Sequence, residues 1–283
     1  MSFRYIDTHV HFWDRARLSY PWLETLPQIS APHLPETYQA ETAVTPPEKI
    51  VFVQCIGDLH RWEEEVTWIE ELAQIDPRIS GIVASAPINE GDATLRILDG
   101  LTQHPLVKAV RHNMQDEEIG HSIRPEFVAG VAACGERGLT FDLCCYHPQL
   151  PDLVELVSRC PHTRFVLDHL GKPGIRDHVI DPWRQHISQL AAQPNVDAKL
   201  SGIVTESDVE NWTIEDLRPY VSHYLSAFGV DRVLFGSDWP VVKLASTHAR
   251  WLATARELTA HLLPENQDKV FFQNAARAYR LGG

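Results

Sequence analysis

Short apolar runs rich in Val, Ile and Phe alternate with longer amphipathic stretches along the whole chain. Strands that are covered on both faces of a parallel sheet have this near-continuous apolar character. The apolar runs therefore predict eight strands, at residues 5–11, 50–54, 79–84, 107–112, 140–145, 164–169, 197–201 and 232–236. The amphipathic stretches predict eight helices, at residues 63–74, 93–101, 125–137, 149–159, 182–192, 215–227, 247–262 and 265–281.

Eight strands that alternate with helices match the count of a (β/α)8 TIM barrel, an α/β fold. The alternative is a doubly wound sheet, but no predicted strand is followed by the glycine-rich phosphate-binding turn typical of that fold. The sequence contains no internal repeat, low-complexity linker or other sign of a domain boundary. We therefore expect a single TIM-barrel domain over residues 1–283.

One long irregular stretch, residues 12–47, separates the first two predicted strands and contains the segment SYPWLETLP. In a TIM barrel a loop after a strand lies at the C-terminal end of the barrel, where active sites are built. Two interpretations stay open. The stretch is a lid or pocket wall over the active face, or Trp13, Tyr20 and Trp22 only pack a loop onto the barrel.

The composition suits a soluble globular protein, with 44% hydrophobic and 22% charged residues. The net charge of -13 disfavours nucleic acid and anionic membrane surfaces as partners. The first ten residues do not resemble a signal peptide, and no apolar run approaches the roughly 18 residues of a membrane span. Five cysteines without a CxxC motif are typical of reduced thiols, so we expect a cytoplasmic protein. Assembly into a homo-oligomer stays an open alternative.

His9 and His11 form an HxH pair at the end of the first predicted strand. A chain with 15 His contains such a pair by chance, so its position carries the information. Residues two apart on a strand point to the same face. Two imidazoles that point into a barrel mouth suit a bound metal or a polarised carbonyl group.

Two further residues are predicted to reach the same end of the barrel. Asp238 follows the last strand in FGSDWP, where a helix N-cap is the alternative to a catalytic acid. His169 ends the sixth predicted strand, where a structural histidine is the alternative. Three imidazoles and one carboxylate could bind a single Zn²⁺ and leave a position for water. We expect the adjacent Asp168 to point away and to serve as a structural hydrogen-bond acceptor.

Seven motifs follow one another along the chain: DTHVHFWD, YPWL, VRHNMQDE, FDLCCYHPQLP, LDHLGKP, KLSGIVTE and FGSDWPV. They run from Asp7 to Val241 and so cover nearly the whole sequence. No single motif is decisive, but the ordered set is specific. It resembles the amidohydrolase superfamily, and within it the lactonase branch that includes L-fuconolactonase and L-rhamnonolactonase.

The resemblance implies a role for each matching residue. His9 and His11 correspond to the family's strand-one pair, and His169 corresponds to its strand-six histidine. Asp238 corresponds to the strand-eight acid, which would be the general base that takes a proton from water. Similar proteins open sugar-acid lactones, and some relatives work without a tightly held metal. We therefore expect either one divalent metal, with Zn²⁺ the first candidate, or direct contact of these side chains with the substrate carbonyl.

The sequence departs from the binuclear members of the superfamily, which carry a bridging Lys or Glu on strand four and a His ending strand five. Here predicted strand four ends in Arg111 and His112, and strand five leads through CCY to His147. Arginine stays protonated and cannot bridge two metals. A binuclear centre is therefore not expected, and His147 stays an alternative ligand.

Other polar residues at strand ends suit a polyhydroxylated lactone. Arg111 could hold the carbonyl or ring oxygen as a fixed donor, although an ion pair within the barrel is an equally open interpretation. Lys172 could do the same or only cap a loop. The remaining candidates for substrate contact are Trp22, Gln54, His112, Gln115, Lys199, Ser201 and Trp239.

These residues together predict a carboxylic ester hydrolase that opens a sugar-acid lactone, with Asp238, His169 and Arg111 as catalytic residues. One alternative is a metal-dependent decarboxylase of an aromatic or muconate-type acid on the same barrel. A second alternative is a non-catalytic sugar-acid binding protein, which the presence of Asp238 disfavours.

Overall fold

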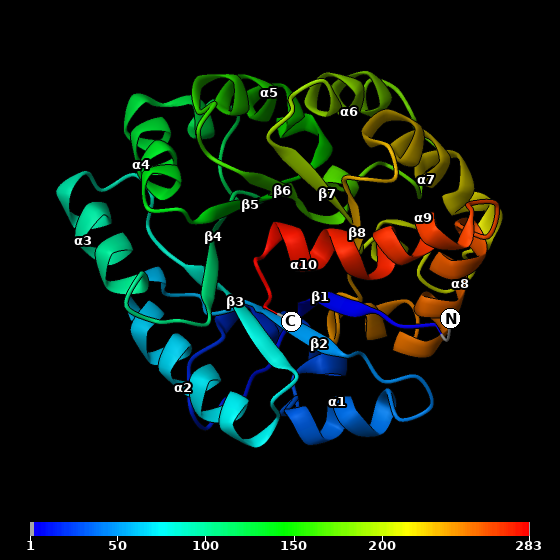
Figure 1. Cartoon of the computed structure of the whole chain (residues 1–283), viewed down its shortest axis with the longest axis horizontal. Coiled ribbons are helices and arrows are strands. Elements are labelled where there is room, and N and C mark those ends of the chain that lie inside the picture. The colour runs from blue at the N-terminus through cyan, green and yellow to red at the C-terminus, as the bar shows by residue number, and fades with distance from the viewer. Residues whose placement is uncertain (1–2, 283) are drawn as a thin grey trace.

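Eight parallel strands form one sheet in the order β1 to β8 in the computed structural model, which describes residues 3–282 (Figure 1). The strands are β1 (Ile6–Val10), β2 (Lys49–Val53), β3 (Ile79–Ser85), β4 (Val107–Asn113), β5 (Thr140–Cys144), β6 (Phe165–Leu167), β7 (Val196–Leu200) and β8 (Val233–Phe235). Nearly all of their residues are buried, because helices cover the outer face and side chains fill the interior. The predicted (β/α)8 barrel is confirmed.

A ring of helices surrounds the strands (Figure 1). They are α1 (Pro35–Glu41), α2 (Trp62–Ile75), α3 (Asp92–Leu101), α4 (Pro125–Glu136), α5 (Leu150–Arg159), α6 (Trp183–Ala191), α7 (Ile214–Phe228) and α8 (His248–Leu258). Pro35 and Pro125 occupy the first turns of their helices, where the missing N–H group costs no hydrogen bond. Within residues 3–282, no helix is both long and apolar enough to cross a bilayer.

Outside the strands, the structure differs from the prediction in three places. The stretch expected to be irregular contains α1 and two short 3-10 helices, Pro21–Thr25 and Pro27–Ile29. The helix expected over residues 247–262 ends at Leu258. The helix expected over residues 265–281 is divided into α9 (Pro264–Asp268), a π-helical segment and α10 (Asn274–Ala278).

The barrel closes between β1 and the segment that follows β8. Val10 forms a parallel bridge with Trp239, whose carbonyl accepts a hydrogen bond from the His11 N–H at 2.8 Å. The Thr8 hydroxyl donates to the Phe235 carbonyl at 2.6 Å. The first and last strands are thus joined beside the HxH pair.

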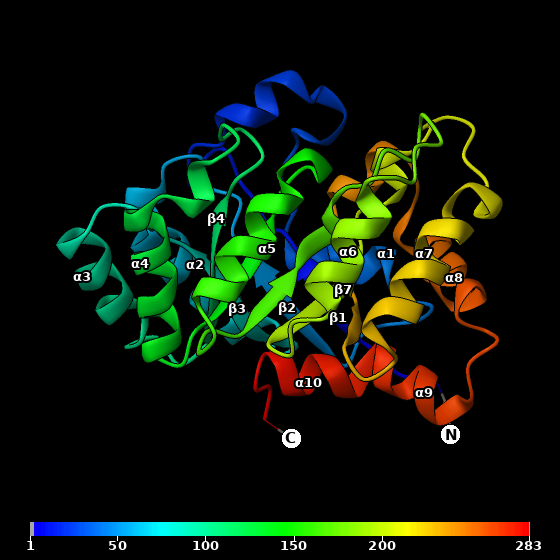
Figure 2. The same ribbon diagram turned by 90° about the horizontal axis from the view of Figure 1, so that it is seen from above.

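The C-terminal segment covers the N-terminal end of the barrel. In Figures 1 and 2, α9 and α10 lie across this end. Thr140, the first residue of β5, donates from its hydroxyl to the Ala278 carbonyl at 3.4 Å. The segment also completes an apolar cluster inside the barrel, whose buried members are Ile6, Val51, Val53, Val83, Ala109, Val166, Leu234, Ala275, Ala278, Tyr279 and Leu281. The barrel interior is therefore apolar at this end, and its polar residues lie toward the opposite end.

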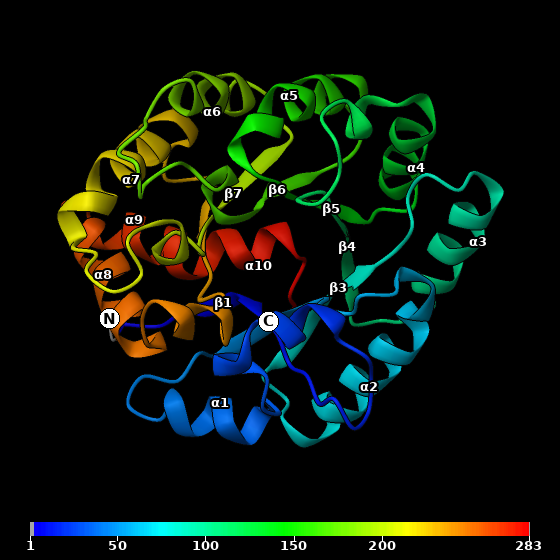
Figure 3. The ribbon, with the colours of Figure 1, turned by 180° about the vertical axis from the view of Figure 1, so that it is seen from behind.

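Residues 12–34 lie at that opposite end, on the far side of the barrel from α9 and α10 (Figure 2). Figure 3 views the barrel from this side and shows the dark blue segment in front of the strands. The Trp22 indole donates to the Cys55 carbonyl at 2.8 Å and packs edge-to-face on Trp13, with ring centroids 5.2 Å apart. Trp13 and Tyr20 are buried, so the segment is packed onto the barrel by its aromatic residues.

Candidate active site at the C-terminal end of the barrel

Three imidazoles surround the carboxylate of Asp238. Its Oδ1 atom lies 3.5 Å from His11 Nε2, 3.7 Å from His9 Nε2 and 4.0 Å from His169 Nε2. All four residues are buried. The structure therefore brings together, within reach of one small ligand, the four residues that the sequence distributes over three strand ends.

The turn after β8 directs Asp238 toward the histidines. Asp238 has a φ of 62°, in the left-handed region that is strained for a residue with a Cβ. Its N–H donates to the His9 carbonyl at 2.9 Å, and its carbonyl accepts from the Val242 N–H at 2.8 Å. At Gly236 a Cβ atom would lie 2.8 Å from the Cβ of His9. Glycine at this position lets the turn approach β1 closely enough for these contacts.

His169 lies in a turn rather than in a strand. β6 ends at Leu167, and His169 has a φ of 53° in the 3-10 turn that follows. Its Nδ1 lies 3.0 Å from the Ser201 Oγ. Gly202 has a φ of 61°, and a Cβ there would lie 2.2 Å from the His169 Nδ1. The segment after β7 therefore fixes the position of this imidazole.

The prediction that Asp168 points away from the site is wrong. The left-handed turn at His169 breaks the alternation of side chains along a strand, so both neighbours enter the barrel. The Asp168 Oδ1 lies 2.9 Å from Lys199 Nζ and 3.4 Å from His9 Nδ1. Its Oδ2 accepts from Arg111 Nη1 at 3.2 Å. Asp168 is a hydrogen-bond acceptor, as expected, but inside the barrel.

Lys199 and Arg111 are two buried cations that contact His9. Lys199 Nζ lies 3.3 Å from His9 Nδ1 and donates to Asp142 Oδ2 at 2.7 Å. Arg111 Nη1 lies 3.4 Å from His9 Nε2, and its Nη2 donates to the Gln54 carbonyl at 2.6 Å. Arg111 thus forms the ion pair that one interpretation of the sequence expected. Lys199, predicted to bind substrate, has its charge matched by carboxylates inside the barrel.

Burial controls the protonation of the site. It lowers the pKa of His169 to about 4 and the pKa of His9 well below its usual value. Burial alone would raise the pKa of Asp238, but its interactions with His169, His11 and His9 outweigh this effect and hold the pKa well below its usual range. At neutral pH the site therefore contains neutral His9 and His169 imidazoles and an ionised carboxylate.

The donor atoms of the site fit one divalent metal ion. His9, His11 and Asp238 each offer one ligand atom, all within 4.8 Å of one another. Ligand atoms around tetrahedral Zn²⁺ lie about 3.3–3.4 Å apart, because each bond is about 2.0–2.1 Å long. The His11 Nδ1 lies 2.7 Å from the Val53 carbonyl, an outer contact that selects the tautomer with a free Nε2. Arg111 adds a fixed positive charge beside this donor set.

Two predicted substrate residues lie away from this group. The Trp239 indole donates to Glu41 Oε2 at 2.9 Å and packs among aromatic residues. His112 alternates with Arg111 along β4 and contacts Glu117 at 3.2 Å, so it faces α4 rather than the barrel interior.

A cavity of about 870 Å³ lies among the loops that follow β5, β6 and β7. Lys172 and His147 line it, and Lys172 Nζ donates to Glu206 Oε1 at 2.7 Å. Burial lowers the pKa of Lys172, but Glu206 and, more weakly, Asp238 raise it above its usual value. Gln115, on the loop after β4, accepts a hydrogen bond from the Cys144 thiol at 3.3 Å.

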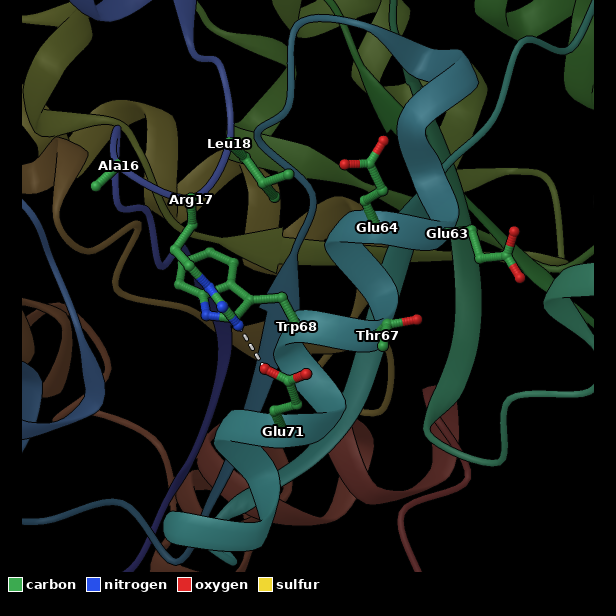
Figure 4. Close-up of a pocket in the computed structure, with 8 residues that line it drawn as sticks. All are labelled: Ala16, Arg17, Leu18, Glu63, Glu64, Thr67, Trp68 and Glu71. Atoms are coloured by element: carbon green, nitrogen blue, oxygen red, sulfur yellow. Dashed lines mark hydrogen bonds and ion pairs between the residues drawn. The ribbon is translucent and has the colours of Figure 1, made fainter.

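A second cavity, of about 580 Å³, lies on the outer surface beside α2 (Figure 4). Glu63, Glu64 and Glu71 of α2 line it together with Arg17, which is ion-paired to Glu71 at 2.5 Å. None of the residues around Asp238 lines this cavity. Its place outside the barrel, between α2 and residues 16–18, separates it from the candidate active site.

Asp7, Asp142 and Tyr279 are buried partners of the site that the sequence interpretation missed. The Tyr279 hydroxyl donates to Asp142 Oδ2 at 2.7 Å, and the Ser237 N–H donates to Asp7 Oδ1 at 2.7 Å. The two carboxylates could have been found, because each interrupts an apolar strand, in YIDTH and FDLCC. A buried carboxylate requires partners. Tyr279 carried no comparable signal, since it continues a helical pattern.

Known proteins resemble this chain over its whole length. The amidohydrolase family model matches residues 6–281. An L-fucono-1,5-lactonase from Burkholderia ambifaria is 30% identical over 99% of this chain and 97% of its own length. The crystal structure of an amidohydrolase from Burkholderia multivorans with bound Zn is 27% identical, with a TM-score of 0.89 over 99% of this chain and 100% of that chain.

More distant structures share the fold alone. The 2,6-dihydroxybenzoate decarboxylase from Rhizobium has a TM-score of 0.68 over 99% of each chain but only 13% identity. The resemblance to the lactonase branch that the ordered motifs indicated is confirmed by the whole-length match. The family model, the barrel and the relatives agree, and the chain belongs to the amidohydrolase family.

Proposed function

We propose that this amidohydrolase opens the ester bond of a sugar-acid lactone by means of a water molecule that Asp238 activates. The observation that carries the proposal is the ionised, buried carboxylate surrounded by the Nε2 atoms of His9, His11 and His169. The activity of the 30% identical L-fucono-1,5-lactonase supports the substrate class. The decarboxylase alternative has weaker support, because the 2,6-dihydroxybenzoate decarboxylase is only 13% identical and shares the fold alone.

The reaction adds water across one C–O bond. Asp238 takes a proton from water while the water oxygen bonds to the lactone carbonyl carbon, which gives a tetrahedral oxyanion. When the ring C–O bond breaks, Asp238 returns the proton to the leaving alkoxide, and the products are the hydroxy acid and the regenerated carboxylate. General base catalysis of this kind contributes about 10²–10⁴-fold in rate.

Arg111 and His169 would stabilise the oxyanion. Arg111 is held by Asp168 and by the Gln54 carbonyl, so its donors are fixed before substrate binds. The Gln54 Oε1 is buried and, within residues 3–282, has no hydrogen-bond partner. A substrate hydroxyl would satisfy it. Lys172 and the cavity beside it are the proposed entrance, and residues 12–34 are the proposed wall on the other side.

His9, His11 and Asp238, together with His169 beside them, would hold one divalent metal, and Zn²⁺ is the first candidate. The ligand spacing and the Zn in the Burkholderia multivorans structure support this part of the proposal. A bound metal would polarise the carbonyl group and lower the pKa of a bound water.

The test is an assay of sugar-acid lactones with a pH indicator, with and without added Zn²⁺, since ring opening releases a proton at neutral pH. Asp238→Asn removes the general base and should lower kcat by about 10²–10⁴-fold, with an unchanged circular dichroism spectrum. Asp231→Asn, at an exposed position, is the control and should keep the full rate. An Asp238→Asn protein that retains most of its rate would refute the assignment, and failure to open any lactone would refute the substrate class.

A further inference from the structure

His112, Glu117 and His121 form a second group of possible metal ligands, on the opposite face of β4 from the active site. The Nε2 of His112 lies 3.2 Å from Glu117 Oε1, and the Nδ1 of His121 lies 3.1 Å from Glu117 Oε2. One ligand atom from each residue lies within 4.8 Å of the other two. Two imidazoles and one carboxylate are a donor set that Zn²⁺ uses when a water completes the tetrahedron.

Hydrogen bonds hold the backbone of the segment that carries these ligands. The Gln149 Nε2 donates to the carbonyls of Met114 at 2.5 Å and of Glu117 at 2.8 Å. The Gly120 N–H donates to Asp152 Oδ2 at 2.6 Å. Asp152 of α5 and Gln149, the residue before α5, therefore fix the segment on both sides of Glu117. A metal ion would meet ligands that are already positioned.

The imidazoles are buried and incompletely satisfied. His112 is 6% exposed and His121 is 7% exposed. Their other ring nitrogens, His112 Nδ1 and His121 Nε2, are buried and have no hydrogen-bond partner among residues 3–282. Each imidazole turns its other nitrogen toward the Glu117 carboxylate, so these two nitrogens and the carboxylate are the atoms that can coordinate an ion.

The surroundings favour a cation and give it access. The Glu117 side chain is 33% exposed, so an ion can reach the carboxylate from solvent. A small cavity beside it is lined by Glu117, Glu118, Asp152 and His121, and no Lys or Arg lines it. Arg124 pairs with Glu118, so Glu117 and Asp152 are the carboxylates that attract a divalent cation to this cavity.

We propose that His112, Glu117 and His121 bind one divalent transition-metal ion, preferably Zn²⁺, at a site between β4 and α4 that is separate from the active site. The ion would join the end of β4, which carries Arg111, to the loop that carries Gln115.

The test measures metal content rather than activity. Metal-depleted full-length protein is equilibrated with excess Zn²⁺ and desalted, and its zinc is counted by mass spectrometry. His121→Ala should retain about one Zn²⁺ per chain less than the wild type. Loss of a direct ligand should weaken binding by more than the roughly 10–100-fold typical of losing an outer contact. His104→Ala is the matched control, because His104 is paired with Glu70 at 2.9 Å without a third ligand.

Glu117→Gln provides a second variant that preserves side-chain shape if His121→Ala does not fold. It should also lose about one Zn²⁺ per chain. Equal zinc in the wild type and both folded variants would overturn the proposal, as would wild-type protein that retains no zinc at all. His11→Ala tests the active-site metal in the same assay, so failure of one site is distinguishable from failure of the other.

Discussion

At the scale of the residue, Asp7 links the two ends of the barrel sheet. Its Oδ1 accepts from the Ser237 N–H at 2.7 Å and from the His9 N–H at 3.3 Å. Its Oδ2 accepts from the Tyr38 hydroxyl at 2.7 Å and lies 3.3 Å from His248 Nε2. The carboxylate does not touch the reacting atoms, but it positions both the HxH strand and the turn before Asp238.

Asp7→Asn should therefore reduce kcat, because it would displace the side chains that Asp7 positions. One amide nitrogen would face hydrogen-bond donors, and the turn that carries Asp238 would shift. A misplacement of about 1 Å can cost roughly 10²-fold in rate. We expect kcat to fall by about that factor while KM changes little, as measured by steady-state kinetics on the best lactone.

Asp14→Asn, in the segment after β1, is the control, because the Asp14 Oδ1 accepts a hydrogen bond from the local Ala16 N–H. If Asp7→Asn lowers the melting temperature but leaves kcat unchanged, Asp7 is structural and does not position the site.

At the scale of the element, α2 contributes a buried carboxylate to the loop after β2. The Glu65 Oε1 accepts from the N–H groups of Cys55 at 3.1 Å and Ile56 at 2.9 Å, whereas its Oε2 is unpartnered among residues 3–282. Burial raises the pKa of Glu65 from 4.5 to about 7. In the unfolded chain this group ionises near its usual pKa.

This difference predicts a pH-dependent stability. As the pH rises from about 4.5 to 7, the unfolded chain releases the Glu65 proton first, so the contribution of Glu65 to stability falls, and its loss is complete above pH 7. Glu65→Gln keeps the acceptor without the charge. Relative to wild type, its free energy of unfolding should gain up to ~3 kcal/mol between pH 4 and pH 8. Urea unfolding at both pH values measures the difference, and a difference that does not change with pH contradicts the prediction.

The elements themselves were largely predictable, because both faces of each strand are covered and the apolar runs are therefore continuous. The helix α1 was missed because it is a short element, Pro35–Glu41, inside a proline-rich stretch. The left-handed turn at His169 could not be predicted from alternation, since the sequence LDHLGKP continues an apolar strand without an early glycine. That turn is why the orientation of Asp168 was predicted wrongly.

At the scale of the whole molecule, the C-terminal segment completes the barrel interior. Tyr279 is fully buried among Val51, Val83 and other strand residues, and its hydroxyl contacts Asp142. Asp142 in turn pairs with Lys199, which approaches His9. A chain of buried polar contacts therefore connects the C-terminal segment to the active site.

Tyr279→Ala should destabilise the fold by about 3–5 kcal/mol, because it leaves a cavity the size of an aromatic ring and removes a partner of Asp142. The free energy of unfolding from urea titration measures this loss. Phe272→Ala, in the same segment but only partly buried, is the control and should cost clearly less. Equal losses for the two variants would show that Tyr279 does not support the interior.

The convergence of His9, His11, His169 and Asp238 was predictable because barrel closure places the C-terminal ends of all strands at one end. The ion pairs of Lys199 inside the barrel could not be predicted. Which carboxylate contacts Lys199 depends on strand register and on the turn after β6. The sequence could likewise indicate candidate substrate residues, but it did not reveal that Trp239 packs against α1.

The bridge between Val10 and Trp239 also bears on how activity arises during folding. Two of the imidazoles come from the first strand, and the general base comes from the segment after the last strand. A chain whose barrel has not closed therefore does not bring them together. Helix content can recover early in refolding, whereas turnover must wait until the two ends of the polypeptide meet. The rate at which catalysis recovers during refolding would therefore report the closure of the barrel.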